Sequence, residues 1–313
     1  MRALASPASL KHVLSAPVAA AALAEGFRRG GAEAVELPVA DGGEGTAEVL
    51  AGVLGGEWYR ARVQDAFGDE HEAPWLVLPD GTAVVEAAAA VPLDPRRLDP
   101  LAASSRGFGE LVAAVLAEGA RSLALCLGGT ATVDGGAGLR EVLDRLPVPA
   151  RVLCDVRTTL WDAPRVFGPQ KGASQEVVAV LEQRLRLLAD LVPYAELPGA
   201  GAAGGLGAAL AALGGELVAG ADWVLEAIGF RERAAAADLV VTGEGRVDAT
   251  TRTGKAPAGV LAAAAELGVR CVVFGGVVET PLEGVETRAL SGDPARAEAD
   301  LRALGEELVA QCH

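Results

Sequence analysis

Five glycine-rich segments constrain the fold of this 313-residue chain more than any other feature. They are residues 41–46, 128–138, 167–172, 199–205 and 242–248, and most of them enclose an acidic residue or a lysine. Glycine lets backbone N–H groups approach an anion closely, so several such loops that open onto helices form a phosphate-binding surface. The interleaved carboxylates suit a divalent cation or a proton acceptor. The segments therefore predict phosphoryl transfer, with the loops gathered in one crevice.

Length and the order of apolar runs predict two α/β domains. A single core usually splits at this size, so we expect two domains, with the entry into the second near residue 58. The N-terminal part alternates predicted strands at 1–5 and 34–38 with predicted helices at 16–29 and 46–54, and Ser15 is the expected N-cap of the first helix. This alternation is typical of a parallel sheet that binds ligands beyond the carboxyl ends of its strands.

The pattern changes between residues 58 and 91, where hairpins are expected. Short runs predict strands at 59–63, 73–78 and 83–86, and Asp80-Gly81 is a clear turn. This passage is interpreted as the entry into a second α/β domain with a mixed sheet. The rest of the chain predicts helices at 107–118, 138–146, 175–195, 205–213, 256–267 and 293–311 and strands at 122–127, 151–156, 238–241 and 270–274.

Composition excludes several classes of function. A net charge of −15 argues against nucleic-acid binding, which needs a basic face, but a local lysine or a backbone nest still binds ATP inside an acidic shell. The four cysteines form no C-x-x-C pair and the three histidines are scattered, so neither disulfides nor a zinc site are expected. No apolar stretch has the form of a leader or a membrane span, so we expect a cytoplasmic protein without a membrane partner.

Two acidic loops are candidates for catalysis. Asp41 and Glu44 lie at the start of a predicted helix, where a capping box is the simpler explanation. Glycine at three of the five positions from 41 to 45 favours instead a role in holding Mg²⁺, the substrate hydroxyl, or both. Asp134 follows Thr130 and Thr132 in the longest glycine loop. The two hydroxyls suit a carboxylate or phosphate, and Asp134 is a candidate proton acceptor.

Lysines beside glycines are candidates for neutralising phosphate. Lys171 and Lys255 each adjoin a glycine, and Lys11 lies in the first strand-to-helix loop. A lysine in such a loop stabilises a transferring phosphoryl group without demanding fixed geometry. The alternative for each of them is an exposed surface charge.

Three alternating charges follow the predicted strand at 238–241. Arg246 is a candidate for a bidentate clamp on a carboxylate or a phosphate. The alternative is a local ion pair with Glu244 or Asp248.

Widespread nucleotide-binding motifs are absent or out of context. Gly254-Lys255 lacks the glycine spacing of a P-loop, and the protein-kinase motif set is missing. Gly199-Ala-Gly-Ala-Ala-Gly204 does match the dinucleotide pattern, with Asp222 about 20 residues further on. Pro198 precedes it and no good strand is predicted there. A phosphate or substrate loop, or a structural helix start, therefore explains this segment better than an NAD(P)-dependent oxidoreductase does.

With these loops in view, the chain resembles the type I glycerate kinase family. Matching stretches include Ala40-Asp-Gly-Gly-Glu-Gly-Thr46 and Val166-Phe-Gly-Pro-Gln-Lys-Gly-Ala173, and others lie at 128–138, 154–156, 198–205 and 238–257. The resemblance implies ATP-dependent phosphorylation of D-glycerate, usually to 2-phosphoglycerate. It also implies two α/β domains with an active-site cleft between them. One of these domains would be flavodoxin-like, with a mostly parallel sheet built from both chain ends, residues 1–57 plus 236–313. The second domain would comprise residues 58–235.

The loop chemistry and the resemblance together give the expected site. Asp41 or Asp134 is expected as the base or Mg²⁺ ligand, Asp155 as a further Mg²⁺ ligand, and Lys171 and Lys11 as the groups that neutralise phosphate. The other candidates for binding substrate or phosphate are Ser9, Gly42, Gly43, Glu44, Gly129, Thr130, Thr132, Gly199, Gly201, Gly204, Glu244, Arg246, Asp248 and Lys255. The expected partners are ATP, Mg²⁺ and D-glycerate, with the chain as a monomer or a homodimer.

The chain departs from the family's pattern at several positions. Ala8 stands where the family has an acid, His12 where it has glycine, Val133 where asparagine is usual and Phe108 where a threonine is expected. The stretch at 157–165 is shorter than in the family. These changes bear on acceptor recognition and turnover. The alternative function is therefore a divergent relative that binds nucleotide or a hydroxy acid without transferring phosphate.

Overall fold

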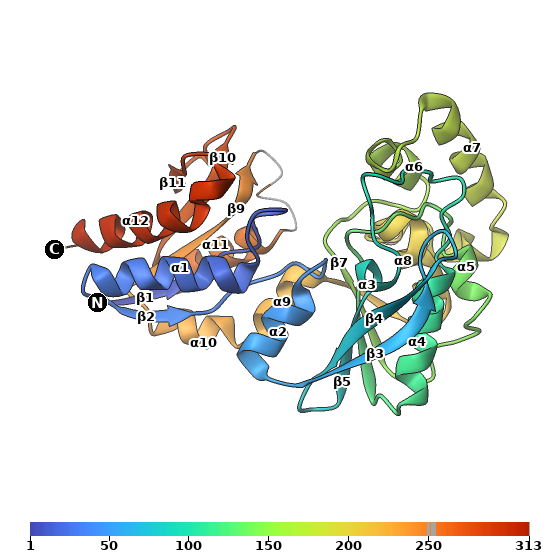
Figure 1. The fold of residues 1–313 in the computed structure, drawn as a ribbon, viewed down its shortest axis with the longest axis horizontal. Coiled ribbons are helices and arrows are strands. Elements are labelled where there is room, and N and C mark those ends of the chain that lie inside the picture. Colours follow the sequence, from blue (N-terminus) through green and yellow to red (C-terminus); the bar gives the residue numbers. More distant parts are fainter. Residues whose placement is uncertain (249–250, 252–254, 313) are drawn as a thin grey trace. The chain divides into compact units, whose positions relative to one another are not determined.

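The computed structural model describes residues 1–248, 251 and 255–312. The chain folds into two compact units, each assembled from separate stretches of sequence (Figure 1). The first unit comprises residues 1–41, 48–53 and 221 onward, and the second comprises residues 42–47 and 54–220. The sequence predicted domain boundaries after residues 57 and 235. That these stretches fold as independent domains stays a prediction.

A five-stranded parallel sheet forms the centre of the first unit. Its strands are β1 (Arg2–Ala5), β2 (Glu33–Glu36), β9 (Leu239–Val247), β10 (Arg270–Val278) and β11 (Glu286–Ala289). They lie in the order β11-β10-β9-β1-β2, and every neighbouring pair is parallel. This is the flavodoxin-like order, in which the direction of winding reverses between β1 and β9. The predicted flavodoxin-like domain, built from both chain ends, is confirmed.

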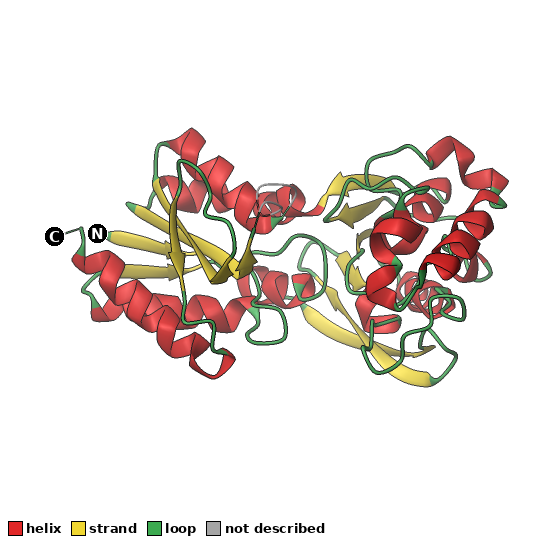
Figure 2. Ribbon diagram, turned by 90° about the horizontal axis from the view of Figure 1, so that it is seen from above, coloured by secondary structure: helices red, strands yellow, loops and turns green. Residues whose placement is uncertain are grey.

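Helices cover both faces of this sheet (Figure 2). On one face α1 (Ala16–Arg29) and α12 (Ala297–Ala310) pack together over a core that includes Ala3, Ala5, Leu239 and Val241. On the other face α11 (Ala256–Leu267) contacts β9 and β10. Because the first core uses the odd-numbered residues of β1 and β9, the even-numbered ones point towards α11. The unit also contains α2 (Thr46–Leu54), α9 (Gly220–Ala227) and α10 (Phe230–Ala235).

The ends of α1 follow the sequence signals in part. Ser15 occupies the N-cap position, as predicted, but its side chain makes no capping bond. The Ser15 hydroxyl donates instead to the carboxylate of Glu48 at 3.1 Å. Within the helix, a Cβ on Gly26 would lie 2.1 Å from the carbonyl oxygen of Arg302 on α12. Glycine is therefore required here by the close approach of the two helices.

A six-stranded mixed sheet forms the centre of the second unit. Its strands, in spatial order, are β3 (Glu57–Gln64), β4 (Glu70–Val77), β5 (Thr82–Glu86), β6 (Ser122–Cys126), β7 (Ala150–Cys154) and β8 (Glu216–Ala219). β3, β4 and β5 pair antiparallel, with the predicted turn at Asp80-Gly81, and β5 to β8 pair parallel. The predicted mixed sheet with hairpins at its start is confirmed.

Helices and short turns surround the second sheet. They are α3 (Ala87–Ala90), α4 (Arg106–Ala117), α5 (Ala137–Arg140), α6 (Ala163–Phe167), η1 (Pro169–Lys171), α7 (Gln175–Arg186), η2 (Ala189–Tyr194) and α8 (Ala202–Ala212). The core of this unit includes Trp75, Phe108 and Leu206. Phe108 and Val133, two departures from the family pattern, are both fully buried. Their apolar side chains therefore serve packing.

Two predicted helices are too long. The predicted helix at 175–195 is wrong beyond Arg186, because α7 ends there and Leu188 has a ψ of 70°, outside the helical region. Pro193 then lies in the short turn η2. The predicted helix at 138–146 contains only α5. α5 ends at Arg140, and further along the chain the backbone N–H of Leu146 donates to the carbonyl of Leu213 at 2.9 Å.

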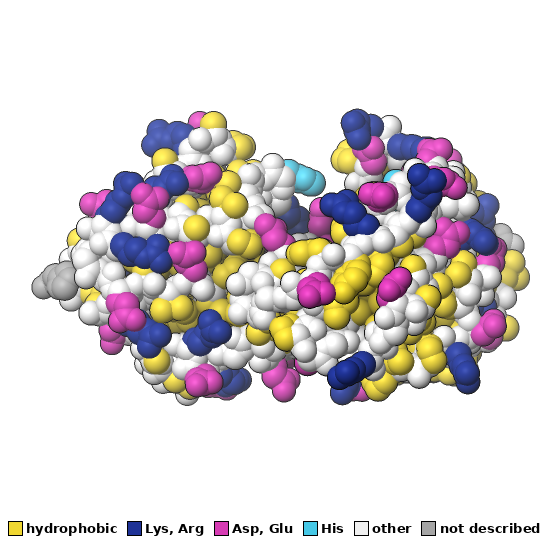
Figure 3. Space-filling model, turned by 60° about the horizontal axis from the view of Figure 1, so that its bottom comes forward, with side chains coloured by type: hydrophobic (Ala, Val, Ile, Leu, Met, Phe, Trp, Pro, Cys, Tyr) yellow, Lys and Arg dark blue, Asp and Glu magenta, His cyan; other side chains and the backbone are white. Residues whose placement is uncertain are grey.

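No helix in the described part of the chain is long and apolar enough to cross a membrane. Acidic and basic side chains are spread over the face seen in the space-filling view (Figure 3).

Candidate functional site

The acidic loop and the longest glycine loop lie directly against each other in the second unit. A Cβ on Gly128 would lie 2.7 Å from the Cα of Gly43, and a Cβ on Gly129 would lie 3.2 Å from Oε2 of Glu44. Thr46 is fully buried and its hydroxyl donates to the carbonyl of Gly43 at 2.7 Å. The absence of side chains at 128 and 129 therefore lets two backbones meet after the carboxyl end of β6.

The segment at 199–205 packs on the other side of the same glycine loop. The backbone N–H of Gly135 donates to the carbonyl of Gly204 at 3.0 Å, and the hydroxyl of Thr132 donates to the carbonyl of Ala203 at 3.3 Å. A Cβ on Gly204 would lie 2.0 Å from the carbonyl oxygen of Thr132. Ala203 itself has a φ of 52°, the left-handed region that costs a residue with a side chain about 1–2 kcal/mol. This segment is thus held in one conformation by the loop beside it.

The structure around residues 199–204 is not that of a dinucleotide-binding motif. The segment follows η2, not a strand, so the strand–turn–helix unit that such a motif needs is missing. Gly199 packs on Cys154, where a Cβ would lie 2.9 Å from Sγ, and a Cβ on Gly201 would lie 2.2 Å from the carbonyl oxygen of Thr159. Close packing accounts for these glycines.

Lys171 is buried at the centre of these loops, with only 3% of the residue exposed. Its Nζ donates to the carbonyl oxygen of Thr132 at 2.8 Å and to Oγ1 of Thr130 at 3.3 Å. Burial lowers the pKa of Lys171 to about 7, while the charges of Asp134 and Asp155 act in the opposite direction. Lys171 is therefore not a surface charge. It is an amine that exchanges its proton near neutral pH beside a glycine loop.

Both carboxylate oxygens of Asp134 accept hydrogen bonds from donors of its own unit. Oδ2 accepts from the backbone N–H of Ser105 at 2.9 Å, from the Ser105 hydroxyl at 2.7 Å and from the N–H of Gly138 at 3.2 Å. Oδ1 accepts from the N–H of Gly136 at 3.1 Å. Such a carboxylate is suited to holding the loop and the starts of α4 and α5. The geometry favours this positioning role over that of a base.

Two functional contacts were missed in the sequence because they join distant segments. Ser105, fully buried at the N-cap position of α4, links Asp134 to the backbone N–H of Leu139, which donates to its hydroxyl at 3.0 Å. Glu86, at the carboxyl end of β5, accepts from the N–H of Ala47 at 2.7 Å and so fixes the start of α2. An acid at the end of an apolar strand was the available signal for Glu86.

A second polar cluster lies in the first unit, just beyond the carboxyl end of β1 and beside the middle of β9. Lys255, at the start of α11, donates to Oε2 of Glu244 at 3.0 Å. The hydroxyls of Ser6 and Thr242 and the other oxygen of Glu244, Oε1, are buried and make no hydrogen bond within the described residues. Each such unsatisfied group costs about 1–3 kcal/mol. They are gathered at the switch point where flavodoxin-like sheets bind ligands.

The loop after β1 adjoins this cluster. A Cβ on Gly245 would lie 3.5 Å from both the Cα of Leu10 and the backbone N of Lys11. Lys11 is exposed and Ser9 half-buried. His12 has a φ of 63°, so this chain keeps a left-handed backbone at a position where glycine is usual in the family it resembles.

The remaining charged candidates of the first unit are not brought together. Arg246 forms an ion pair at 2.6 Å with Glu279, a residue 33 positions further along the chain. The N–H of Asp248 donates to Oγ1 of Thr251 at 3.0 Å. Residues 249, 250 and 252–254 of the stretch that matches the family lie outside the described residues.

The carboxylates predicted to hold Mg²⁺ do not form a ready-made metal centre. No group of three or more His, Cys, Asp or Glu side chains suited to a metal ion occurs among the described residues. Asp41 belongs to the first unit and Asp155 to the second. Mg²⁺ in kinases is held by one or two carboxylates together with the substrate phosphates. Asp155, whose charge acts on Lys171, therefore fits a magnesium that arrives with a nucleotide.

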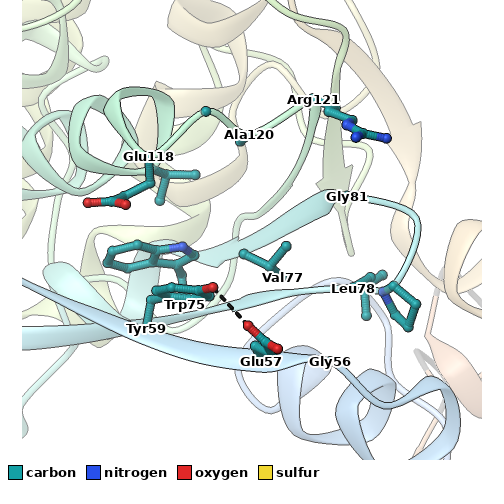
Figure 4. Close-up of a pocket in the computed structure, with 13 residues that line it drawn as sticks. Gly56, Glu57, Tyr59, Trp75, Val77, Leu78, Gly81, Glu118, Ala120 and Arg121 are labelled. Carbon is teal, nitrogen blue, oxygen red and sulfur yellow. Dashed lines mark hydrogen bonds between the residues drawn. The ribbon is translucent and has the colours of Figure 1, made fainter.

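A hollow of the second unit lies at the other end of its sheet. A cavity of about 610 Å³ is lined by Tyr59, Trp75, Glu57, Glu118 and Arg121, among others. The rings of Tyr59 and Trp75 stack 5.6 Å apart, and the Tyr59 hydroxyl donates to Glu57 at 2.9 Å (Figure 4). Gly81 and Arg121 precede β5 and β6, whereas the glycine loops follow the carboxyl ends of β6 and β7. This cavity is therefore separate from the loop cluster.

Comparison with known proteins identifies relatives over most of the chain. The profile of the glycerate kinase family matches residues 3–147 and 140–293. Glycerate 2-kinase of Escherichia coli K12 is 38% identical over 310 residues, which cover 83% of this chain and 81% of the relative. Glycerate kinase of Bacillus subtilis 168 is 38% identical over 328 residues, which cover 89% and 85%. A crystal structure assigned to glycerate kinase 2 of Salmonella typhimurium LT2 matches with a TM-score of 0.83 and 32% identity, covering 100% of this chain and 98% of that chain.

Proposed function

The chain belongs to the glycerate kinase family, and we propose that it transfers the γ-phosphoryl group of ATP to D-glycerate, giving 2-phosphoglycerate. The observation that carries this proposal is the closure of glycine-rich backbone around the buried amine of Lys171 in the second unit. The name of the Escherichia coli relative, glycerate 2-kinase, supports transfer to the 2-hydroxyl.

Lys171 has the role of neutralising phosphate charge. Its pKa of about 7 in the free protein rises when a phosphate brings negative charge next to it, so the bound complex holds the protonated amine. Phosphoryl transfer depends mainly on positioning and charge neutralisation, with little covalent chemistry by the protein. A buried cation fixed to Thr130 and Thr132 meets that need.

The acidic residues divide into two roles. Asp134 holds the glycine loop in place through its four donors. Asp155, with Asp41 as the second candidate, would hold Mg²⁺ that enters with ATP and supplies further charge neutralisation at the transferring group. The main chain of Gly129 and its neighbours would offer N–H groups to the phosphates of a bound nucleotide.

The direct test is release of ADP that depends on D-glycerate. Purified protein with ATP and Mg²⁺ should release ADP when D-glycerate is added and much more slowly without it. The Lys171→Met variant, which keeps the aliphatic stem and removes the charge, should lose about 10²–10³-fold in kcat. Stabilisation by ATP with no glycerate-dependent release would contradict the proposal and leave a nucleotide-binding protein that does not transfer phosphate.

A further inference from the structure

The unpaired polar atoms of the first unit share one face of the sheet. β1 and β9 pair in parallel with Ala5 opposite Val241, which places Ser6 beside Thr242 one residue later. Glu244 follows Thr242 by two residues on β9 and so points to the same side. This is the side covered by α11, whose first residues follow Lys255. The four side chains thus form one cluster beneath the start of a helix.

The unpaired atoms specify what a ligand must supply. Ser6 and Thr242 are fully buried and their hydroxyls accept or donate, whereas an ionised Glu244 only accepts. A ligand for Oε1 of Glu244 must therefore bring a hydrogen-bond donor. The ammonium group of Lys255, 3.0 Å from Oε2 of Glu244, favours negative charge on the same ligand. A small molecule with a hydroxyl group and a carboxylate meets both conditions.

We propose that the cluster of Ser6, Thr242, Glu244 and Lys255 binds the hydroxy acid and that Glu244 is the base of the reaction. This inference rests on the proposed kinase function. Oε1 of Glu244 accepts the proton of the attacking hydroxyl while that oxygen forms its bond to the γ-phosphorus. The bond from the γ-phosphorus to the bridging oxygen of ATP breaks, and ADP leaves with the electron pair. Unlike Asp134, Glu244 has a carboxylate oxygen that accepts from no donor among the described residues.

Glu244→Gln tests the assignment of the base, with Glu266→Gln as the control. The glutamine keeps the size of the side chain but cannot take the proton, so kcat should fall by about 10²–10⁴-fold while the KM for ATP stays nearly constant. Glu266 is an exposed acid of the same unit that pairs with Arg231, and its variant should behave as wild type. Normal kcat in Glu244→Gln, with wild-type turnover confirmed, would overturn the inference and leave the kinase function standing.

Thr242→Val tests the cluster by two effects of opposite sign. Removing an unpaired buried hydroxyl should raise the melting temperature of the free protein by about 2–4 °C and weaken D-glycerate binding, measured by calorimetry without nucleotide, about tenfold. In the control, Thr287→Val, the lost hydroxyl already donates to the carbonyl of Val285, so glycerate affinity should not change. Unchanged glycerate affinity in Thr242→Val, or no glycerate binding to the wild type, would overturn the inference even if the protein released no ADP.

Discussion

At the scale of single residues, the decisive feature is a buried amine. Burial disfavours its charged form, while two hydrogen-bond acceptors and the charges of Asp134 and Asp155 favour it. Lys171 keeps its place because two oxygens accept from it, while burial lowers its pKa to about 7. A lysine in the unfolded chain has a pKa near 10.4. Folding therefore releases a proton from Lys171 between these two values, and the stability of the protein depends on pH in that window.

Stability should rise with pH in the wild type relative to Lys171→Met. Between about pH 7 and pH 10.4 the unfolded chain binds more protons at this residue than the folded one, so the free energy of unfolding increases with pH by up to about 5 kcal/mol. The penalty of burying the cation is complete below pH 7 and disappears above pH 10.4. Urea unfolding of both proteins across this range measures the difference, and parallel curves would contradict the account.

Asp134→Asn should damage folding as well as turnover. The amide replaces one accepting oxygen by a donor, which faces either the N–H of Gly136 or the N–H groups of Ser105 and Gly138. We therefore expect a loss of about 2–4 kcal/mol in the free energy of unfolding. Asp144→Asn, at an exposed acid of the same unit, is the matched control. A variant of Asp134 with wild-type stability and abolished turnover would instead identify this carboxylate as the base.

At the scale of elements, backbone contacts between loops hold the site together. The acidic loop, the longest glycine loop and the 199–205 segment meet where glycines leave no side chain between them. The sequence predicted the acidic loop and the longest glycine loop because glycine and acid cluster at the ends of apolar runs, and it predicted the 199–205 segment from its glycines alone. It did not reveal that Gly201 and Gly204 are needed for packing, since that depends on Thr159 and Thr132 from other parts of the chain.

Gly204→Ala should destabilise the second unit more than Gly214→Ala. Both glycines have positive φ, 70° and 99°, and so share a similar backbone strain. A Cβ at 204 would lie 2.0 Å from the carbonyl oxygen of Thr132, whereas nothing lies within 4 Å of a Cβ at 214. We expect about 1 kcal/mol at 214 and at least about 3 kcal/mol at 204, measured by thermal or urea unfolding. Equal losses would show that the loops are not tightly packed.

Helix caps and hydrophobic periodicity in the sequence predicted helices and strands well where no contact with a distant residue determined where an element ends. The start and end of α1 and the extent of α11 agree with the caps and periodicity of the sequence. The helix predicted at 175–195 failed because its pattern continues past Arg186, while the backbone at Leu188 leaves the helical region. Ser105 and Glu86 could not be assigned, because their partners lie 29 and 39 residues away.

At the scale of the whole molecule, the proposed substrates are anions and the chain itself is acidic. With a net charge of −15, attraction for the proposed substrates ATP and D-glycerate must come from local groups, for which Lys171 and Lys255 are our candidates. The fold class and the kinase family agree with the sequence prediction. The predicted cleft between the domains, the cytoplasmic location and the oligomeric state stay predictions.

The most direct test of the central claim is NMR of the product formed from ATP and D-glycerate. We predict a new phosphorus signal coupled to the proton on C2 of glycerate, and we predict that this signal is lost in Lys171→Met. A signal coupled to the C3 protons would retain the kinase and move the acceptor to the other hydroxyl. A spectrum without any phosphoglycerate, from a folded protein saturated with both substrates and Mg²⁺, would contradict the claim.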